Sequence, residues 1–243
     1  PLAELDQPGA DLVNWVISPI GMAGEAGVWL NQGANLSFSA GRAWIENLNE
    51  RIIELPWAHA AASRLPTGSA VLDIGAAESL FAIELATMGH RTIALDPRGY
   101  GLTHPNLDVV TEAVEDWDGP SQPLDAVFSI SAIEHFGLGH YVPAAEQSGL
   151  DRVAMERFAS WLRPDGLLFL TAPFGTWSVD ELQRVYDTDH LAELIDGWKV
   201  IDRSVYARAS STEWSRLDAE RIDAPWAHPD AGVVLLELAR PAP

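Results

Sequence analysis

The sequence contains no cysteine among its 243 residues. This absence excludes disulfide bonds, thiolate metal sites and cysteine nucleophiles, and it is consistent with a cytoplasmic protein. Long apolar runs are also missing, because no stretch of about 18 consecutive apolar residues is available to span a membrane. The first residues, PLAELDQPGADLVNW, carry no basic segment ahead of an apolar core, so we expect no signal peptide.

Positive charge is scarce. The chain has 15 Lys and Arg against 35 Asp and Glu, a formal net charge of −20, and Lys199 is its single lysine. Such an acidic surface repels phosphate backbones, so we expect no DNA or RNA partner. An anionic ligand would have to be met by arginine or by backbone N–H groups.

The hydrophobic fraction of 47% is enough to build a core, and the length suits one large domain or one domain with a cap. An amphipathic helical pattern runs from Gly41 to Leu65, and Pro66 follows it. The glycine- and asparagine-rich segment before this pattern is expected to be loop. We therefore predict a helical N-terminal cap over residues 1–66 and a second domain over residues 67–243. The apolar positions at helical spacing are Trp44, Leu48, Ile52 and Leu55.

Strand-like and helix-like segments alternate from Ser69 onward, which predicts an α/β fold with a mostly parallel sheet covered by helices on both faces. Two longer strands with no helical pattern between them close the chain and predict an antiparallel hairpin at the sheet edge. The predicted strands are Ala70–Ile74, Arg91–Leu95, Leu107–Thr111, Ala126–Ser131, Leu167–Ala172, Lys199–Arg208 and Gly232–Ala239, and the predicted helices are Ser79–Met88, Asp151–Leu162 and Leu191–Ile195.

A turn of small residues, Gly75-Ala76-Ala77, follows the first of these strands, and Asp96 ends the second. Open α/β sheets bind ligands at this switch point. Small side chains let the backbone approach a ligand, and an acid about 20 residues further on can accept hydrogen bonds from ribose hydroxyls. The pair predicts a nucleotide or nucleoside site.

Both NAD and S-adenosylmethionine (SAM) use this layout. A dinucleotide needs a glycine-rich turn for its pyrophosphate, but this turn has Ala77 and Ser79 in place of glycines, and Glu78 adds a negative charge. SAM carries no phosphate and has two cationic groups, so an acid near the turn is tolerable. The charge argument favours SAM.

Five segments, found in order at suitable spacing, resemble class I SAM-dependent methyltransferases over roughly Ser69 to the C-terminus, which implies a Rossmann-like fold. They are VLDIGAAES, ALD, VVTEAVEDW, LDAVFSISAIEHFGLGHY and LRPDGLLFLTAPFG. Within that superfamily, ESLFAIELATMGHRTIALDPRGYGLTHPN and SAIEHFGLGHY look like bacterial methyltransferases of glycan and natural-product pathways, including sugar O-methyltransferases of the TDP-hexose or rhamnose type.

The resemblance implies a set of cofactor-binding residues. Those on the methionine side of SAM are Asp73 and the turn formed by Gly75, Ala76 and Ala77, and Asp96 holds the ribose. The segment from Glu112 to Glu115 edges the adenine, with Glu112 and Val114 as candidates, although Ala113 stands where an acid is common. Ser129 and Ser131 would face the transferred methyl group.

Methylation of a hydroxyl requires a base, and SAIEH follows the fourth strand at the mouth of the predicted site. His135 is the first candidate because its unperturbed pKa is near neutrality. Glu134 would orient it or bind a metal. The alternative is that His135 only packs locally.

Several residues are candidates for the acceptor side. His140, Tyr141, Trp177 and Arg184 are expected to bind substrate, with Arg184 or Arg98 available for a diphosphate. Loop tryptophans, which also include Trp29, Trp214 and Trp226, offer rings that stack on a sugar or base. Asp187 and Asp189 could join Glu134 around Mg²⁺, or Asp189 or Thr188 could simply cap a helix.

The sequence thus predicts a SAM-dependent O-methyltransferase acting on a sugar or a sugar nucleotide, such as a TDP-deoxyhexose, in antibiotic or glycan biosynthesis. The alternatives are an NAD(P)-dependent oxidoreductase, a SAM-binding subunit without activity, and an N-methyltransferase of an aminosugar. Metal dependence and homo-oligomer formation stay open.

Overall fold

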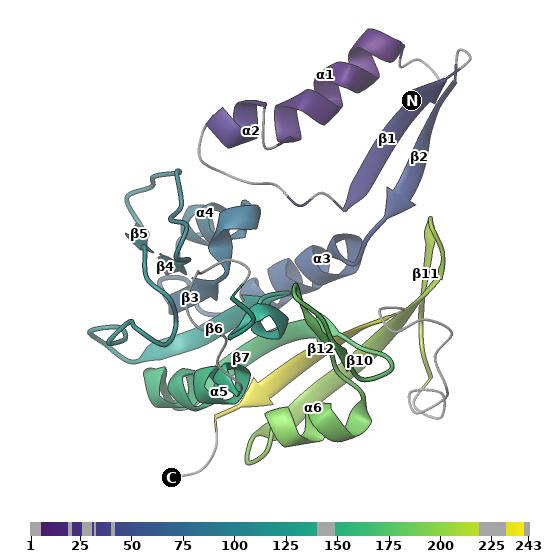
Figure 1. The fold of residues 1–243 in the computed structure, drawn as a ribbon. Helices are drawn as coiled ribbons and strands as arrows, with labels where there is room; N and C mark the ends of the chain where they lie inside the picture. The colour runs from purple at the N-terminus through teal and green to yellow at the C-terminus, as the bar shows by residue number, and fades with distance from the viewer. Residues whose placement is uncertain are drawn as a thin grey trace.

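A computed structural model gives the fold of the chain and describes residues 6–18, 21–25, 31, 33–39, 42–139, 149–218 and 232–240. A central sheet forms the body, and an N-terminal group of two helices and a β-hairpin stands beyond its edge (Figure 1). Within the part of the chain that is described, no helix is long and apolar enough to cross a membrane.

The central sheet has eight strands in the order β11-β10-β12-β7-β6-β3-β4-β5. Its parallel part consists of β3 (Ala70–Ile74), β4 (Arg91–Leu95), β5 (Leu107–Val110), β6 (Leu124–Ile130) and β7 (Leu162–Pro173). Its antiparallel part consists of β12 (Gly232–Ala239), β10 (Lys199–Ser210) and β11 (Glu213–Arg216). The sheet confirms the predicted fold class, including the antiparallel edge.

Side chains alternate between the two faces of the sheet, and each face meets its own helices. On one face, α3 (Arg51–Ala62) and α4 (Phe81–Thr87) cover Val71, Phe128 and Phe169. On the other face, α5 (Leu150–Trp161) and α6 (Thr188–Leu194) pack over a second apolar layer that includes Leu72 and Val127. All five positions of β3 are buried, and every residue of the strand is apolar except Asp73.

The predicted N-terminal helix is only partly right. The segment expected to be helical from Gly41 begins as strand β2 (Arg42–Leu48), which pairs with β1 (Ala34–Ser39), and the helix α3 starts at Arg51 and continues through Pro56. Trp44 and Leu48 are four residues apart, a spacing that fits one face of a helix and also one face of a strand. Bulky aromatic and β-branched neighbours favour the strand.

Other departures are smaller. Two helices, α1 (Gln7–Ile17) and α2 (Met22–Glu25), precede the hairpin, and α2 and β1 lie in the segment expected to be loop. Trp214 lies in β11 rather than in a loop, and the short strands β8 (Ser178–Val179) and β9 (Arg184–Val185) were not predicted. Trp29 and Trp226 lie outside the described residues. The division of the chain into two domains at residue 66 stays a prediction.

Phe128 provides a test of the core beneath α3 and α4. Its ring is fully buried, with centroids 4.8 Å from stacked Phe169 and 5.1 Å from Phe81, which meets it edge-on. Phe128→Ala should lower the free energy of unfolding by about 3–5 kcal/mol, because it removes these contacts and leaves a cavity. Urea unfolding measures the loss. The control Val109→Ala, at a position 40% exposed on β5, should change it by less than about 0.5 kcal/mol. Similar small losses in both variants would contradict this packing.

Candidate functional site

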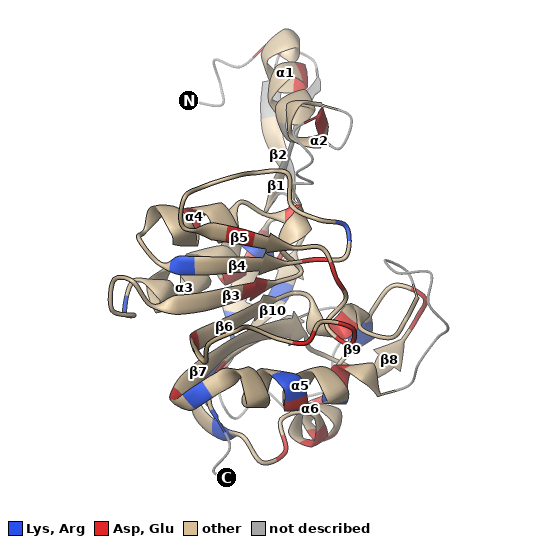
Figure 2. Ribbon diagram, turned by 90° about the vertical axis from the view of Figure 1, so that its left-hand side faces the viewer, with Lys and Arg blue, Asp and Glu red and all other residues tan. Residues whose placement is uncertain are grey.

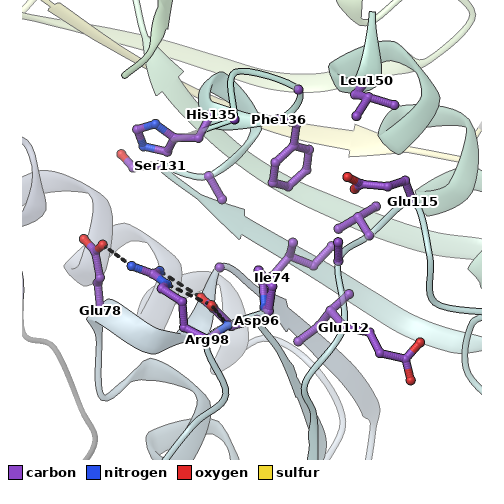
Figure 3. A pocket seen from close by; sticks show the side chains of 18 of the residues that line it. Ile74, Glu78, Asp96, Arg98, Glu112, Glu115, Ser131, His135, Phe136 and Leu150 are labelled. Carbon is purple, nitrogen blue, oxygen red and sulfur yellow. Dashed lines mark hydrogen bonds and ion pairs between the residues drawn. The ribbon is translucent and has the colours of Figure 1, made fainter. Parts of the chain in front are cut away.

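A cavity opens where β3, β4 and β6 end. Gly75 follows β3, Asp96 follows β4 and Ser131 follows β6, and all three line the cavity. Figure 3 shows Asp96 and Ser131 there. It holds about 830 Å³ of empty space, counting the solvent at its open mouth. Its position at the carboxyl ends of adjacent parallel strands is the ligand-binding position of open α/β sheets.

The turn after β3 needs glycine at one position only. Gly75 has φ = +76°, a left-handed conformation that side chains disfavour, and a Cβ there would lie 2.8 Å from the Cβ of Ala132. Ala76 and Ala77 follow in the short helix η2 (Ala76–Glu78), and Ser79 has extended backbone. The missing glycines therefore leave this turn unstrained.

Asp96 accepts four hydrogen bonds. Its Oδ2 accepts from Ala77 N–H at 3.0 Å and from Arg98 Nη2 at 2.9 Å, and its Oδ1 accepts from Arg98 N–H at 2.9 Å and Arg98 Nε at 3.0 Å. Arg98 Nη1 also reaches Glu78 Oε1 at 2.6 Å. A carboxylate has about four lone-pair positions, so Asp96 is saturated by protein donors in this conformation.

Arg98 also forms an ion pair with Glu78, so the negative charge of Glu78 beside the turn is not isolated. The charge of Glu78 was expected to disfavour a pyrophosphate, but Arg98 pairs with both Glu78 and Asp96 (Figure 3). The charge near the turn is therefore partly compensated, and the preference for SAM over NAD has to rest on the rest of the site.

Asp73 is a buried acid directly before the turn. Burial raises its pKa to about 8, against the opposing effect of Arg51, and its Oδ2 has no hydrogen-bond partner among the described residues. Ser129 in β6 is also buried with an unpartnered hydroxyl oxygen. Asp73, Ser129, Ala76 and Ala77 are not among the lining residues, so they lie behind the wall of the cavity.

Hydrogen bonds with two residues of α3 hold the end of β6 in place. Ser131 has φ = 45°, which is left-handed for a residue other than glycine. Its hydroxyl donates to Glu54 Oε1 at 2.7 Å, Thr171 Oγ1 donates to the same oxygen at 2.6 Å, and the Ser131 N–H donates to Thr171 Oγ1 at 2.9 Å. Arg51 donates to the Ile130 carbonyl at 3.1 Å. Two residues one helical turn apart thus fix the backbone at the site.

His135 follows at the next turn, in η3 (Ile133–His135), and its ring lies beside Ser131 at one end of the cavity (Figure 3). Its Nδ1 lies 2.6 Å from the carbonyl oxygen of Leu182, which only accepts, so Nδ1 carries the proton. In the neutral ring the lone pair is then on Nε2. Glu134 Oε1 lies 3.7 Å from this Nε2, and burial raises the pKa of Glu134 well above its usual value.

A second cavity adjoins the first. Arg51, Glu78, Ser131 and His135 line both, so the two cavities share a wall. The first cavity adds apolar residues such as Leu95, Val114 and Phe136, whereas the second adds polar and apolar residues in equal number. The predicted residues Glu112 and Val114 line the first cavity, and Glu134 lines the second.

The structure describes two of the four residues that were predicted to bind the acceptor. His140 and Tyr141 lie outside the described residues. Trp177 stacks on His190 with ring centroids 3.7 Å apart, and Arg184 is buried and donates to the carbonyl of Phe136 at 2.6 Å. Neither of them is a lining residue of the two cavities, and both support the loops around the site.

Of the two roles open to Asp187 and Asp189, the described residues show a helix cap rather than a cluster of metal ligands. Within the described part of the chain, no group of three or more His, Asp or Glu side chains is arranged to hold a metal ion. Asp187 instead caps α6, where its carboxylate accepts from the His190 N–H at 2.9 Å. The cap is therefore Asp187, one or two residues before the predicted Thr188 or Asp189, because the helix begins one turn earlier than expected.

Sequence reasoning missed Arg51 and Glu54. Charged residues three apart on an amphipathic helix usually form an exposed pair, and nothing local in RIIEL distinguishes a buried one. Their position beneath Ser131 depends on contacts across 77 positions of the chain. No local signal in the sequence could have found it.

Comparisons with known proteins place this geometry in a wider context. A family model described as "Caenorhabditis protein of unknown function, DUF268" matches residues 106–228, just over half of the 243 residues. A search of curated proteins finds no significant match.

Solved structures with the same fold are methyltransferases. One is a 1,6-didemethyltoxoflavin-N1-methyltransferase from Burkholderia thailandensis with S-adenosylhomocysteine bound, at 16% identity and a TM-score of 0.50, covering 77% of each chain. Another is the N-methyltransferase NodS from Bradyrhizobium japonicum, at 13% identity and 0.50, covering 80% of this chain and 100% of that one. A third, described only as a putative methyltransferase, is from Bacillus halodurans, at 10% identity and 0.50, covering 78% and 99%. At these identities the likeness establishes the fold.

The pH dependence of thermal stability tests the burial of Asp73. Its raised pKa means that the folded state holds this proton up to about pH 8, whereas the unfolded chain releases it near pH 4. Its contribution to stability is therefore lost as the pH rises through that window. The side chain of Asp73→Asn does not titrate, so the Tm of this variant should rise relative to that of wild type between pH 6 and pH 9. The change corresponds to up to about 3 kcal/mol in the free energy of unfolding.

The matched control is Asp125→Asn. Asp125 accepts from Ala70 N–H at 2.7 Å and pairs with Arg163 at 3.0 Å, so its loss should lower Tm at both pH values. A Tm difference between Asp73→Asn and wild type that stays constant from pH 6 to pH 9 would contradict the buried, proton-holding state of Asp73.

Proposed function

We propose that this chain, which belongs to the DUF268 family, is a SAM-dependent methyltransferase that methylates a hydroxyl of a small polar acceptor, a sugar. The observation that carries the proposal is the pair of cavities with a common wall formed by Arg51, Glu78, Ser131 and His135. A methyl donor in the first cavity would meet an acceptor in the second at this wall. Such an arrangement holds two reactants in contact and in line.

The first cavity suits the cofactor at three points. Gly75, which lines the cavity at the end of β3, would leave room for the methionine part of the cofactor, with the buried carboxyl of Asp73 behind it. Val114 and Phe136 offer apolar surface to an adenine ring. Asp96 is the acid available to ribose hydroxyls. The Burkholderia thailandensis structure, with S-adenosylhomocysteine bound in the same fold, supports this assignment.

In the proposed site, Arg98 controls whether the ribose of the cofactor can reach Asp96. Because Arg98 supplies three of the four hydrogen bonds that saturate the Asp96 carboxylate, ribose can use Asp96 only after the guanidinium has turned away. Glu78 remains as a partner for the displaced guanidinium. Cofactor binding therefore includes the cost of opening this ion pair.

The reaction needs an acceptor oxygen in line with the methyl group and a place for its proton. A bound SAM would supply a methyl carbon on a sulfonium. The acceptor oxygen would bond to that carbon as the carbon–sulfur bond breaks, and its proton would go to a base. His135 Nε2 is the base, because Leu182 holds the other ring nitrogen as the protonated donor. Glu134 Oε1 lies 3.7 Å from this Nε2, and burial raises the pKa of the Glu134 carboxyl well above its usual value.

A hydroxyl acceptor is favoured over an amine by this placement of His135. A neutral amine attacks through its lone pair and loses its proton afterwards, whereas an ordinary hydroxyl is a poor nucleophile until a base removes its proton. The acceptor is proposed to be a sugar unit of secondary-metabolite or glycan biosynthesis. Residues 6–25 and the β1–β2 hairpin are proposed to cap the site.

Arg98→Ala tests the proposed access step. Removing the guanidinium frees Asp96 for ribose, so the affinity for S-adenosylhomocysteine should rise roughly fivefold, the equivalent of about 1 kcal/mol for a partly exposed ion pair. Isothermal titration calorimetry measures the change. Arg64→Ala, which removes another arginine–carboxylate pair (with Glu237, at 2.6 Å) away from the cavities, should leave the affinity unchanged. Weaker binding by Arg98→Ala would mean that Arg98 stays in place and supports the cofactor.

His135→Ala tests the proposed chemistry. Turnover should fall by roughly 10²–10⁴-fold, because the general base is lost, while the affinity for S-adenosylhomocysteine stays within a few-fold of wild type. Methyl transfer from labelled SAM to the acceptor measures turnover. His59→Ala is a matched control, since His59 also has Nδ1 2.6 Å from a carbonyl (Leu55) and Nε2 near a glutamate (Glu84), but it lines neither cavity. Unchanged turnover in His135→Ala would remove His135 from the mechanism.

A further inference from the structure

Most of the residues that only the second cavity adds come from outside the parallel part of the sheet. Asn31 and Arg51 come from the N-terminal region and the start of α3, Gln183 comes from the β8–β9 turn, and Arg208 and Trp214 come from β10 and β11. The first cavity thus lies at the carboxyl ends of the parallel strands, whereas these additional segments form much of the second.

The N-terminal and C-terminal walls of this cavity are tied together. Leu48 N–H donates to the Ser211 carbonyl at 2.7 Å, and the Trp214 indole N–H donates to the Leu48 carbonyl at 2.9 Å. Arg208 also donates to Asn47. The end of β2 is thus fastened to the β10–β11 hairpin, although the two segments are more than 160 positions apart in the chain. The cavity is consequently preformed.

Two of its lining residues have hydrogen-bonding atoms that the protein leaves unused. Arg51 and Glu134 are 6% and 2% exposed, and neither Arg51 Nε nor Glu134 Oε2 has a partner among the described residues. An unsatisfied buried donor or acceptor costs about 1–3 kcal/mol, so a ligand that satisfies both is favoured. One is a donor and the other is a carboxyl oxygen. A hydroxyl group can accept from the first and donate to the second.

The charges around the cavity disfavour an anion. The carboxyl groups of Glu50 and Glu78 line it beside that of Glu134, whose pKa burial raises, and the guanidinium groups of Arg51 and Arg208 already donate to Ile130 and Asn47. Acidic segments also lie in loops near the carboxyl ends of the strands (Figure 2), on a chain with a net charge of −20. A phosphate or diphosphate here would face like charges without a free arginine pair.

The remaining lining is apolar. Pro173, Leu182 and Val233 contribute aliphatic surface, and Trp214 contributes an aromatic ring whose N–H is already bonded. Apolar surface beside hydrogen-bonding groups matches the two faces of a sugar ring, which has C–H faces and hydroxyls at its edge.

From these observations we infer that the second cavity binds the acceptor as an uncharged polyhydroxylated unit, with one hydroxyl between Arg51 and Glu134 and the reacting hydroxyl facing His135. The inference rests on the proposed function, and it deepens it: the acceptor is a free sugar, a polyol or a finished neutral glycoside rather than a sugar phosphate or a nucleotide-linked sugar.

Calorimetric titration into the complex of the full chain with S-adenosylhomocysteine tests the inference. The probes are methyl α-rhamnoside, methyl glucoside and myo-inositol, each compared with charged counterparts: rhamnose 1-phosphate, TDP-rhamnose, glucose 6-phosphate and TDP-glucose. At least one neutral probe should bind at least about tenfold more tightly than its charged counterpart. Tighter binding of the phosphorylated or TDP-linked forms, or binding of no neutral probe, would overturn the inference.

Two substitutions at Glu134 separate a ligand contact from a structural effect. Glu134→Leu removes the hydrogen-bonding oxygens and should weaken binding of the neutral probe by about tenfold or more, while Glu134→Gln should keep it within a few-fold. Both should bind S-adenosylhomocysteine as wild type does, which also reports that they are folded. Equal affinity of Glu134→Leu and wild type for the neutral probe would contradict the assigned contact.

The same experiment distinguishes failure of the inference from failure of the proposed function. If wild-type protein does not bind S-adenosylhomocysteine, the proposed function fails, and the probes are then titrated into the free chain. Preference for neutral probes there would still support the polyol site, and its absence would overturn both.

Discussion

A single buried carboxylate, that of Glu54, fixes the part of the molecule where the two cavities meet. It accepts hydrogen bonds from the hydroxyls of Ser131 and Thr171 through one oxygen, and it is fully buried. These bonds hold Ser131 at φ = 45°, a conformation that costs energy for a residue with a side chain and persists only where its surroundings impose it. The position of Ser131 in turn sets the approach of η3 and His135 to the site.

The site concentrates ionisable groups that the protein buries at a cost. Desolvation raises the pKa of Glu54, Asp73 and Glu134, while Arg51 opposes the rise at each of them. Aromatic packing around Phe128 and the fully buried strand β3 stabilise the sheet beneath these groups. Buried polar groups with unused hydrogen-bonding capacity are typical of binding sites, because a ligand restores the missing partners.

The central sheet could be predicted closely from the sequence, and the N-terminal region could not. The bounds of β3, β4 and β12 match the expected ones because each is a short apolar run between turn residues. Trp44 and Leu48 were misassigned because a four-residue spacing suits both a helix and a strand. Gly75, Asp96, Ser131 and His135 were found as neighbours because they follow successive strands, whereas Arg51 and the second cavity depend on contacts between distant segments.

The most direct test of the account is a calorimetric titration of the wild-type chain with S-adenosylhomocysteine, with NADH titrated in parallel. We expect saturable binding of S-adenosylhomocysteine with one site per chain and no binding of NADH. The cavity at the ends of β3, β4 and β6 has an acid for ribose, and its lining arginines Arg98 and Arg51 pair with the carboxylates of Glu78 and Asp96 and with the Ile130 carbonyl. Binding of NADH without S-adenosylhomocysteine would contradict the methyltransferase assignment and favour a dinucleotide-dependent oxidoreductase.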